Sequence, residues 1–216
     1  MREIKKKFYG ENLFMHPTFD NCSVKPYISF RFISNCLQVE IETDRLFIRS
    51  YKPNDFENCI SLYGNEAITK YFDYGKVRNE LEIKNLIIEK GYRYFSKGKP
   101  FGLFSIFQKK SMAFIGQIDF LPSEELGAAE IGFILHEQYH NQGFCSEAVK
   151  VIIFDYVEML NNRGFECDEL PISKVIATVH PKNQPSKKVL QNVGMTLDKI
   201  QERFGQPRLW YSIPTS

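Results

Sequence analysis

A buried strand followed by a polar loop and a long helix is the most constraining feature of the sequence. Residues 129–135 (AEIGFIL) form a nearly apolar run, the polar loop HEQYHNQ follows, and Gly143 stands where a helical pattern begins. Apolar residues then recur at helical spacing, at Phe144, Ala148, Val149, Ile152, Tyr156 and Leu160. The pattern predicts a strand–loop–helix unit over residues 129–160, as is typical of domains that mix strands and helices.

The start of that helix is suited to binding a phosphate group. Unpaired N–H groups in a first helical turn, together with the positive end of the helix dipole, attract anions. Gly143 has no Cβ and lets a ligand approach the backbone closely, while Gln142 and Ser146 could add side-chain donors. The alternative is an ordinary connection in which Gly143 only eases the turn, since short glycine motifs often occur by chance. The sequence contains neither a P-loop nor a G-x-G-x-x-G fingerprint, which argues against a nucleotide site.

The remaining patterns predict one domain built on a mixed sheet. Strands are expected at residues 27–33, 46–48, 101–107, 112–121, 129–135, 174–179 and 208–213. Helices are expected at residues 53–62, 80–95, 143–160 and 183–193. This order indicates an α/β (α+β) fold with a mostly antiparallel central sheet of about six to seven strands and helices on both faces. We expect residues 1–40, which lack a clear period, to form an N-terminal extension packed on a main domain of residues 41–216.

Composition narrows the classes of partner. The 28 basic and 26 acidic residues are mixed along the chain and give a net charge of +2, which argues against direct nucleic-acid binding. The five cysteines form no CxxC pair and no Cys/His cluster with zinc spacing, so we expect reduced thiols and no metal. No apolar run has the length of a membrane span or of a signal peptide, so we expect a soluble, cytoplasmic protein.

Two further segments carry polar residues of interest. Asn183 and Ser186 share one face at the start of the predicted helix 183–193, where simple N-terminal capping is the alternative to a binding role. Glu130 interrupts an apolar strand, so it is either paired, at an exposed edge, or functional. Strand alternation places Glu130, Gly132 and Ile134 on one side of that strand. A carboxylate there could attract an alkylammonium ion and accept its proton through water, because an amine is nucleophilic only after deprotonation.

Three segments in register resemble the GNAT acetyltransferase superfamily, and in particular its branch that acetylates the N-termini of ribosomal proteins. They are Glu42–Arg49 (ETDRLFIR), residues 129–135 with the loop HNQGFC at 140–145, and NQPSKKVL at 183–190 followed by Gly194 and Met195. The resemblance covers roughly residues 41–213. The family's loop has Gln or Arg where this chain has His140, and Gly or Ala where it has Cys145. Leu190 stands where many members carry a catalytic Tyr, and the ribosomal-type branch also lacks that Tyr.

The resemblance implies a GNAT fold and acetyl-CoA as cosubstrate. Glu130 and Ser186 are then the candidate catalytic residues, Ser186 lying near the thioester sulfur. The implied coenzyme-binding residues are Phe133, Ile134, Leu135, His140, Asn141, Gln142, Gly143, Phe144, Cys145, Ser146 and Asn183, the last binding the pantetheine arm. A main-chain N–H near Ile134 or Leu135 could polarise the thioester carbonyl. Cys145 is not expected to carry the acyl group, because small buried cysteines are common and it has no His/Asp partner in sequence.

The expected function is therefore transfer of an acetyl group from acetyl-CoA to a primary amine, by direct attack in a ternary complex. A protein or peptide N-terminus is the favoured acceptor, and a polyamine or aminoglycoside is the alternative. A non-catalytic acyl-CoA-binding or regulatory module on the same scaffold is a second alternative. The chain is expected to act as a monomer or homodimer, without a membrane partner.

Overall fold

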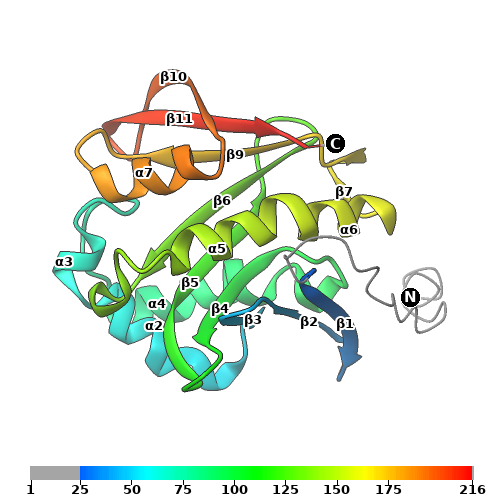
Figure 1. Ribbon diagram of the computed structural model, residues 1–216. Coiled ribbons are helices and arrows are strands. Elements are labelled where there is room, and N and C mark those ends of the chain that lie inside the picture. Colours follow the sequence, from blue (N-terminus) through cyan, green and yellow to red (C-terminus); the bar gives the residue numbers. More distant parts are fainter. Residues whose placement is uncertain (1–24, 216) are drawn as a thin grey trace.

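A computed structural model describes residues 25–215, in which a central sheet is covered by helices on both faces (Figure 1). Within these residues the sheet has nine strands in the order β1-β2-β3-β4-β5-β6-β9-β11-β10. The strands are β1 (Tyr27–Ile33), β2 (Cys36–Glu42), β3 (Leu46–Ser50), β4 (Gly102–Gln108), β5 (Ala113–Pro122), β6 (Ala128–Leu135), β9 (Lys174–Val179), β10 (Thr196–Arg203) and β11 (Gln206–Pro214). A separate small hairpin is formed by β7 (Glu166–Cys167) and β8 (Leu170–Pro171).

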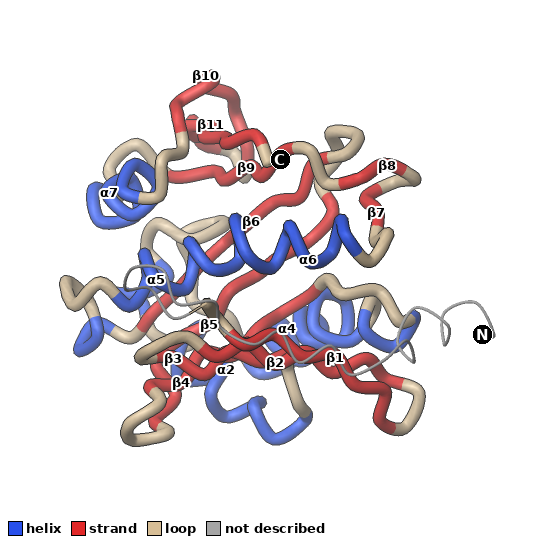
Figure 2. The backbone as a smooth tube through the Cα atoms, turned by 45° about the vertical axis from the view of Figure 1, so that its right-hand side comes forward, coloured by secondary structure: helices blue, strands red, loops and turns tan. Residues whose placement is uncertain are grey.

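One long helix crosses the sheet on one face and shorter helices cover the other. The long helix is continuous through α5 (Phe144–Val151), the π-helical turn η5 (Ile152–Tyr156) and α6 (Val157–Asn162), and it lies alongside β6 in Figures 1 and 2. The remaining helices are η1 (Pro53–Asp55), α2 (Phe56–Tyr63), α3 (Glu66–Thr69), α4 (Glu80–Leu86), the π-helical turn η2 (Ile87–Tyr92), η3 (Phe95–Lys97), η4 (Glu137–Tyr139) and α7 (Gln184–Asn192).

The two faces of the sheet bury separate apolar cores. Ile131 and Leu135 of β6 pack in the core under α5, η5 and α6, together with Leu190 of α7. Ile134 packs instead in the core under α2 and α4. These contacts confirm the predicted alternation along β6, since odd- and even-numbered residues point to opposite faces.

The sheet class predicted from the sequence is confirmed, with two strands more than the upper estimate. Strand β2 was not predicted although Leu37, Val39 and Ile41 alternate with polar residues and are fully buried. Strand β10 gave no such signal, because nearly all of its residues are exposed at the edge of the sheet. The described part of the predicted N-terminal extension forms β1 and most of β2, a hairpin that continues the sheet beside β3. The rest of the predicted extension lies outside the described residues.

Strands β6 and β9 separate after a short parallel ladder. All other neighbours in the sheet are antiparallel, whereas β6 and β9 are parallel and pair only from Ala128–Glu130 to Lys174–Ile176. Beyond that point β6 stays paired with β5, and β9 stays paired with β11. The sheet therefore opens between residues 131–135 and residues 177–179.

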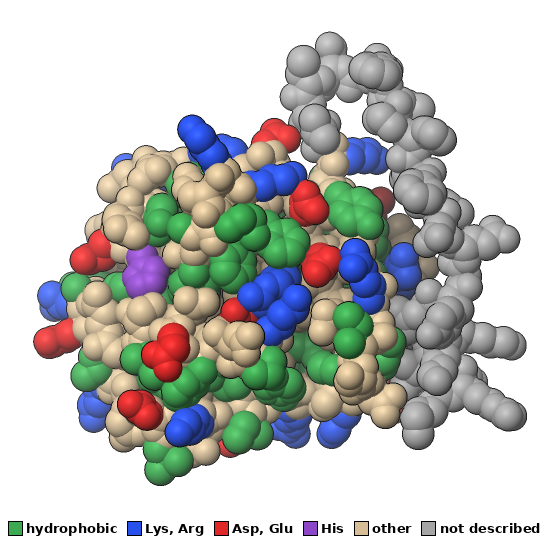
Figure 3. All heavy atoms as spheres, turned by 90° about the horizontal axis from the view of Figure 1, so that it is seen from below, with side chains coloured by type: hydrophobic (Ala, Val, Ile, Leu, Met, Phe, Trp, Pro, Cys, Tyr) green, Lys and Arg blue, Asp and Glu red, His purple; other side chains and the backbone are tan. Residues whose placement is uncertain are grey.

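Charged groups of both signs are interspersed on the face seen in Figure 3. Among the described residues, no helix is both long and apolar enough to span a bilayer.

Candidate active site

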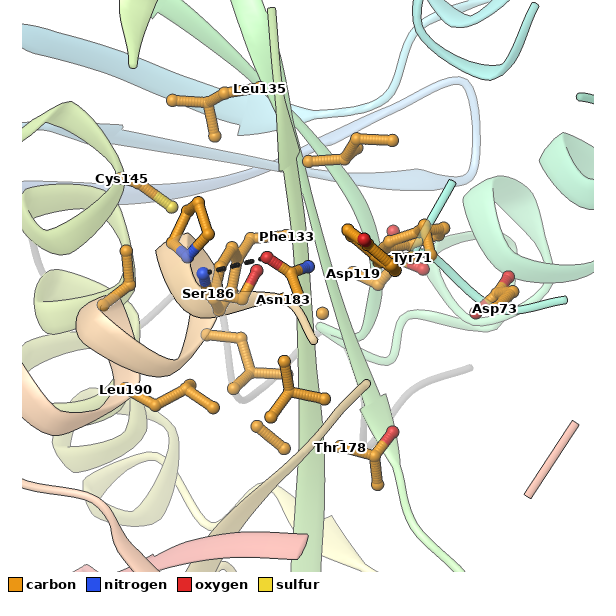
Figure 4. Close-up of a pocket in the computed structure, with 18 of the residues that line it drawn as sticks. Tyr71, Asp73, Asp119, Phe133, Leu135, Cys145, Thr178, Asn183, Ser186 and Leu190 are labelled. Atoms are coloured by element: carbon orange, nitrogen blue, oxygen red, sulfur yellow. Dashed lines mark hydrogen bonds between the residues drawn. The ribbon is translucent and has the colours of Figure 1, made fainter. Parts of the chain in front are cut away.

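A cavity of about 740 Å³ occupies the opening between β6 and β9. Figure 4 shows that side chains enter it from both sides of the strands that cross the view. One side, here called the helix side, carries Cys145 from α5 and Asn183, Ser186 and Leu190 from the α7 segment. The other, here called the loop side, carries Asp119 from β5 with Tyr71 and Asp73 from the loop between α3 and α4. The cavity is large enough for the reactive portions of two substrates.

Gly143 introduces helix α5 in the left-handed conformation. Its φ is +79°, which glycine adopts without the steric penalty that a Cβ brings. A Cβ at this position would also lie 3.3 Å from Nη2 of Arg45. Both observations explain a glycine here by the turn itself, the alternative considered from the sequence, and its role in admitting a phosphate stays a prediction. Gly143, Cys145 and Ser146 line the cavity, and the first N–H groups of a helix have no partner within the helix.

Arg45 and Glu147 fix the loop that leads into α5. Arg45 Nε donates to Glu147 Oε2 at 2.6 Å, and Arg45 Nη1 donates to the carbonyl oxygen of Gln142 at 2.9 Å. Thr43 Oγ1 donates to Glu147 Oε1 at 2.5 Å. The guanidinium of Arg45 also lies 4.6 Å from the centroid of the Phe144 ring. These contacts therefore join segment 42–49 to the loop, although the two are far apart in the sequence.

The residues predicted to bind a coenzyme divide into two groups. Nine of the eleven predicted residues line the cavity: Phe133, Ile134, Leu135, His140, Asn141, Gly143, Cys145, Ser146 and Asn183. The side chains of Gln142 and Phe144 lie elsewhere: Gln142 Nε2 donates to the carbonyl of Gln138 at 2.7 Å, and Phe144 is buried in the core. His140 Nε2 donates to the carbonyl of Leu135 at 3.0 Å, so it closes the loop and keeps only Nδ1 for other partners.

Cys145 is held as a neutral thiol. Burial raises its pKa far above the ordinary value, because the thiolate would be desolvated. A protonated thiol is a weak nucleophile, which agrees with the expectation that Cys145 does not carry an acyl group.

Helix α7 presents Asn183 and Ser186 to the cavity. Asn183 Oδ1 accepts a hydrogen bond from the main-chain N–H of Ser186 at 3.2 Å, so the capping role considered from the sequence is present. Capping uses the amide oxygen and leaves the amide NH₂ to face the cavity that Asn183 lines. The hydroxyl of Ser186 makes no hydrogen bond to another residue of the described part of the chain. Leu190 is buried on the same wall.

Glu130 is paired, as one of the interpretations from the sequence required. Its Oε1 accepts from Arg203 Nη1 at 2.5 Å and from Thr178 Oγ1 at 3.4 Å. Its side chain retains 24% exposure and lines the cavity. Arg203 could not be identified from the sequence because it lies at the end of the unpredicted strand β10.

The loop side is joined to the β10–β11 hairpin by Arg208. This buried guanidinium donates from Nη1 to the carbonyl of Tyr71 at 2.9 Å and from Nη2 to the carbonyl of Asp73. Tyr71 also stacks on His180, with ring centroids 4.9 Å apart. Burial lowers the pKa of His180, and the charge of Arg208 lowers it further. These residues were not predicted to belong to the site. Within residues 25–215, no group of three or more His, Cys, Asp or Glu is placed to hold a metal ion.

Similar proteins and solved structures identify the family of this chain. Residues 45–196 match the family model for the acetyltransferase (GNAT) domain. A Bacillus subtilis (strain 168) protein called the uncharacterized N-acetyltransferase YnaD is 28% identical over 157 residues, which cover 73% of this chain and 82% of YnaD.

Two solved structures share the fold. The ribosomal-protein-S5-alanine acetyltransferase from Vibrio fischeri has a TM-score of 0.61 at 16% identity, covering 81% of this chain and 96% of that one. The spermidine N-acetyltransferase from Vibrio cholerae, in complex with CoA and spermine, has a TM-score of 0.62 at 15% identity, covering 80% of this chain and 96% of that one. The family match, which extends over most of the chain, shows that this protein belongs to the GNAT acetyltransferase family and is an acetyltransferase enzyme.

Proposed function

We propose that this enzyme transfers an acetyl group from acetyl-CoA to a primary amine, which attacks the thioester directly in a ternary complex. The observation that carries the proposal is the opening between β6 and β9, which meets the Gly143 turn at the start of α5. A strand edge that has lost its ladder partner can bind the amide groups of a pantetheine arm, and a helix start can bind the diphosphate.

The residues present fit such a coenzyme. The first turn of α5 would receive the diphosphate, while residues 131–135 of β6 and the amide NH₂ of Asn183 would bind the pantetheine arm. The thioester would then lie near Ile134, where a main-chain N–H would polarise the carbonyl, and near the hydroxyl of Ser186 on the helix side. A serine hydroxyl is a poor acid, so Ser186 would support the departing sulfur by hydrogen bonding.

Glu130 is proposed to accept the proton of the acceptor. Once deprotonated, the amine nitrogen attacks the carbonyl carbon, a C–N bond forms and the C–S bond breaks. The sulfur leaves as a thiolate, which takes up the second proton that the attacking nitrogen releases. The proton lost by the ammonium passes to Glu130 through water. Arg203 and Thr178 hold the Glu130 carboxylate in one orientation. Arg203 therefore acts as a positioning residue.

The acceptor that we favour is a protein or peptide N-terminus. Structures with the same fold include both a ribosomal-protein acetyltransferase and a spermidine acetyltransferase, so the fold itself is compatible with either class. The balance of charge favours a single cation over a polyamine, because five carboxylates and four cationic side chains among the described residues line the cavity. A polycation would require a larger surplus of acidic groups. We place this reaction in the cytoplasm, where the free thiols of the described cysteines would stay reduced.

The test combines binding with turnover. Isothermal titration calorimetry should show that the purified protein binds CoA and acetyl-CoA. Thiol release should then depend on a primary amine, offered as peptides with N-terminal alanine or serine and as spermidine. Glu130→Gln should lower kcat on the order of 100- to 10,000-fold while the dissociation constant of acetyl-CoA stays unchanged.

A matched control for Glu130 is Glu125→Gln. Glu125 is also ion-paired, with Lys174 at 3.1 Å, but it does not line the cavity, so this variant should retain full activity. A folded protein that ignores coenzyme A would contradict the proposal. Tight binding without turnover of any amine would favour a non-catalytic acyl-CoA-binding module.

A further inference from the structure

Asp119 is a buried carboxylate that the proposed reaction has not used. It lies on β5 and is only 6% exposed, yet it lines the cavity on the loop side. Its Oδ1 accepts from Gln117 Nε2 at 2.9 Å, and its Oδ2 accepts from Lys90 Nζ at 3.3 Å. A carboxylate offers about four acceptor positions, so these two donors leave capacity for a ligand.

The surroundings of Asp119 hold its carboxylate in one orientation. Gln117 Nε2 also donates to the hydroxyl of Tyr63 at 2.6 Å, and Cys59 Sγ donates to Gln117 Oε1 at 3.4 Å. The charge of Asp119 raises the pKa of Lys90, which therefore stays a cation. Lys90 comes from the π-helical turn η2, a type of distortion that is frequent at functional sites.

Gly132 gives the cavity access to Asp119. The two residues are direct partners in the β5–β6 ladder and point to the same face of the sheet. A Cβ on Gly132 would lie 3.5 Å from the Cβ of Asp119 and 3.9 Å from its Oδ2. The missing side chain therefore leaves the carboxylate uncovered at the strand that we propose binds the thioester.

Asp119 also lies close to the proposed proton acceptor. Leu121 pairs with Glu130 in the ladder, so Asp119 and Glu130 are diagonal neighbours on one face. Diagonal positions in an antiparallel pair are about 7–8 Å apart, a span that an amine bound at Asp119 can bridge to Glu130 through one water.

The alternative is that Asp119 and Lys90 form an ion pair that serves only the fold. Buried ion pairs are weak sources of stability, because the desolvation of both charges offsets their attraction. A purely structural pair also gives no reason for a glycine opposite the carboxylate or for its place on a cavity wall.

We propose that Asp119 binds the ammonium group of the acceptor before that group loses its proton to Glu130. This inference rests on the proposed acetyl transfer and specifies its acceptor subsite. The site takes a single primary ammonium, because Lys90 repels a second cation next to the same carboxylate. Figure 4 shows Asp119 across the strands from Ser186, so the bound ammonium and the proposed partner of the sulfur would lie on different sides of the strand that binds the thioester.

The experiment measures the Michaelis constants of the acceptor and of acetyl-CoA separately. The acceptor is the best substrate among the alanine peptide, the serine peptide and spermidine. Asp119→Asn should raise the KM of the acceptor on the order of 10- to 100-fold, because a charge-assisted hydrogen bond is lost. The dissociation constant of acetyl-CoA, measured by calorimetry, should stay within about twofold of the wild-type value.

A second variant guards against loss of folding. Gly132→Ala keeps the carboxylate and its partners, makes only ordinary van der Waals contact, and covers the carboxylate from the cavity, so it should also raise the KM of the acceptor. The matched control is Asp198→Asn, which removes the carboxylate of an exposed pair with Lys174 at 3.5 Å and should change neither constant.

The outcomes separate this inference from the proposed function. A raised KM of the acceptor in both folded variants, with unchanged acetyl-CoA binding, supports Asp119 as the ammonium site. A wild-type KM in either folded variant overturns it while leaving acetyl transfer intact. A wild-type protein that neither binds acetyl-CoA nor turns over any of the three amines overturns both.

Discussion

Replacing Gly143 by alanine tests the proposed diphosphate site most directly. Gly143 has a φ of +79°, a conformation that costs a residue with a Cβ about 1–2 kcal/mol. The added Cβ would also lie 3.3 Å from Arg45 Nη2, but this guanidinium is 47% exposed and can shift by a few tenths of an ångström. The total penalty is therefore about 1–2 kcal/mol, nearly all of it from the backbone.

The penalty has to appear either as lost stability or as lost affinity. If the loop keeps its shape, the melting temperature falls by about 2–8 °C for a chain of this size. If the exposed loop relaxes to a negative φ, the N–H groups leave their positions and CoA binding weakens by about 5- to 30-fold. We expect the larger part to appear as weaker binding, because the loop lies at the surface and relaxes with little disturbance of the core.

The assay is calorimetric titration with CoA alongside thermal unfolding of the same preparation. Gly194→Ala is the matched control: its φ is +87°, and its added Cβ would meet only Ile213 Cδ1 at 3.6 Å. The control should lower the melting temperature by a similar amount without altering CoA affinity. If Gly143→Ala binds CoA within about twofold of the wild-type affinity, the helix start is not the diphosphate site and the reasoning fails.

Three further predictions concern neighbouring residues. Arg45→Ala should weaken CoA binding, measured by calorimetry, about fivefold. The protein should lose little stability, because exposed ion pairs contribute at most about 1 kcal/mol. Unchanged affinity would contradict the role of Arg45 in holding the loop. Arg203→Met should lower kcat on the order of 10- to 100-fold without changing the KM of acetyl-CoA, because Glu130 loses its orientation. An unchanged kcat in steady-state assays would refute the positioning role of Arg203. The pKa values of His136 and His180 are both lowered by burial, so the unfolded state binds more protons near pH 6, and the urea midpoint should fall as pH drops from about 7 to 5. Replacing both histidines by glutamine should flatten that fall, and an unaltered pH profile would show that other groups cause it.

The parts of the site that are contiguous in sequence were the parts that could be predicted. The Gly143 turn, the α7 cap and Glu130 each carry a local signal: a glycine before a helical period, a capping residue, and a charge in an apolar strand. Local chemistry fixes such features, so the sequence alone is enough to find them.

Residues that depend on strand pairing were missed for two different reasons. Arg203 lies on β10, whose exposed residues show no alternation, and only its pairing with β11 makes it a strand. Asp119 did carry a signal that was not used, because Gln117 and Asp119 are polar residues two positions apart in an apolar strand. Two polar groups on one face of a buried strand must find partners, and they mark a polar cluster beneath the sheet.

The topology explains why the opening that we assign to the coenzyme does not unfold the sheet. The chain passes from β6 to β9 through the long helix, so these strands are parallel where every other neighbouring pair is antiparallel. Each of the two keeps a ladder on its outer side, β6 with β5 and β9 with β11. The inner ladder can therefore end after three residues of each strand without leaving either strand unsupported. Beyond it, the main-chain groups on the inner edges of the two strands lack a strand partner. Ligands in open α/β sheets bind at such a crossover, beyond the carboxyl ends of the strands. The same crossover starts helix α5 beside the end of β6, so one change of strand direction supplies both the open edge and the helix start that the proposed site requires.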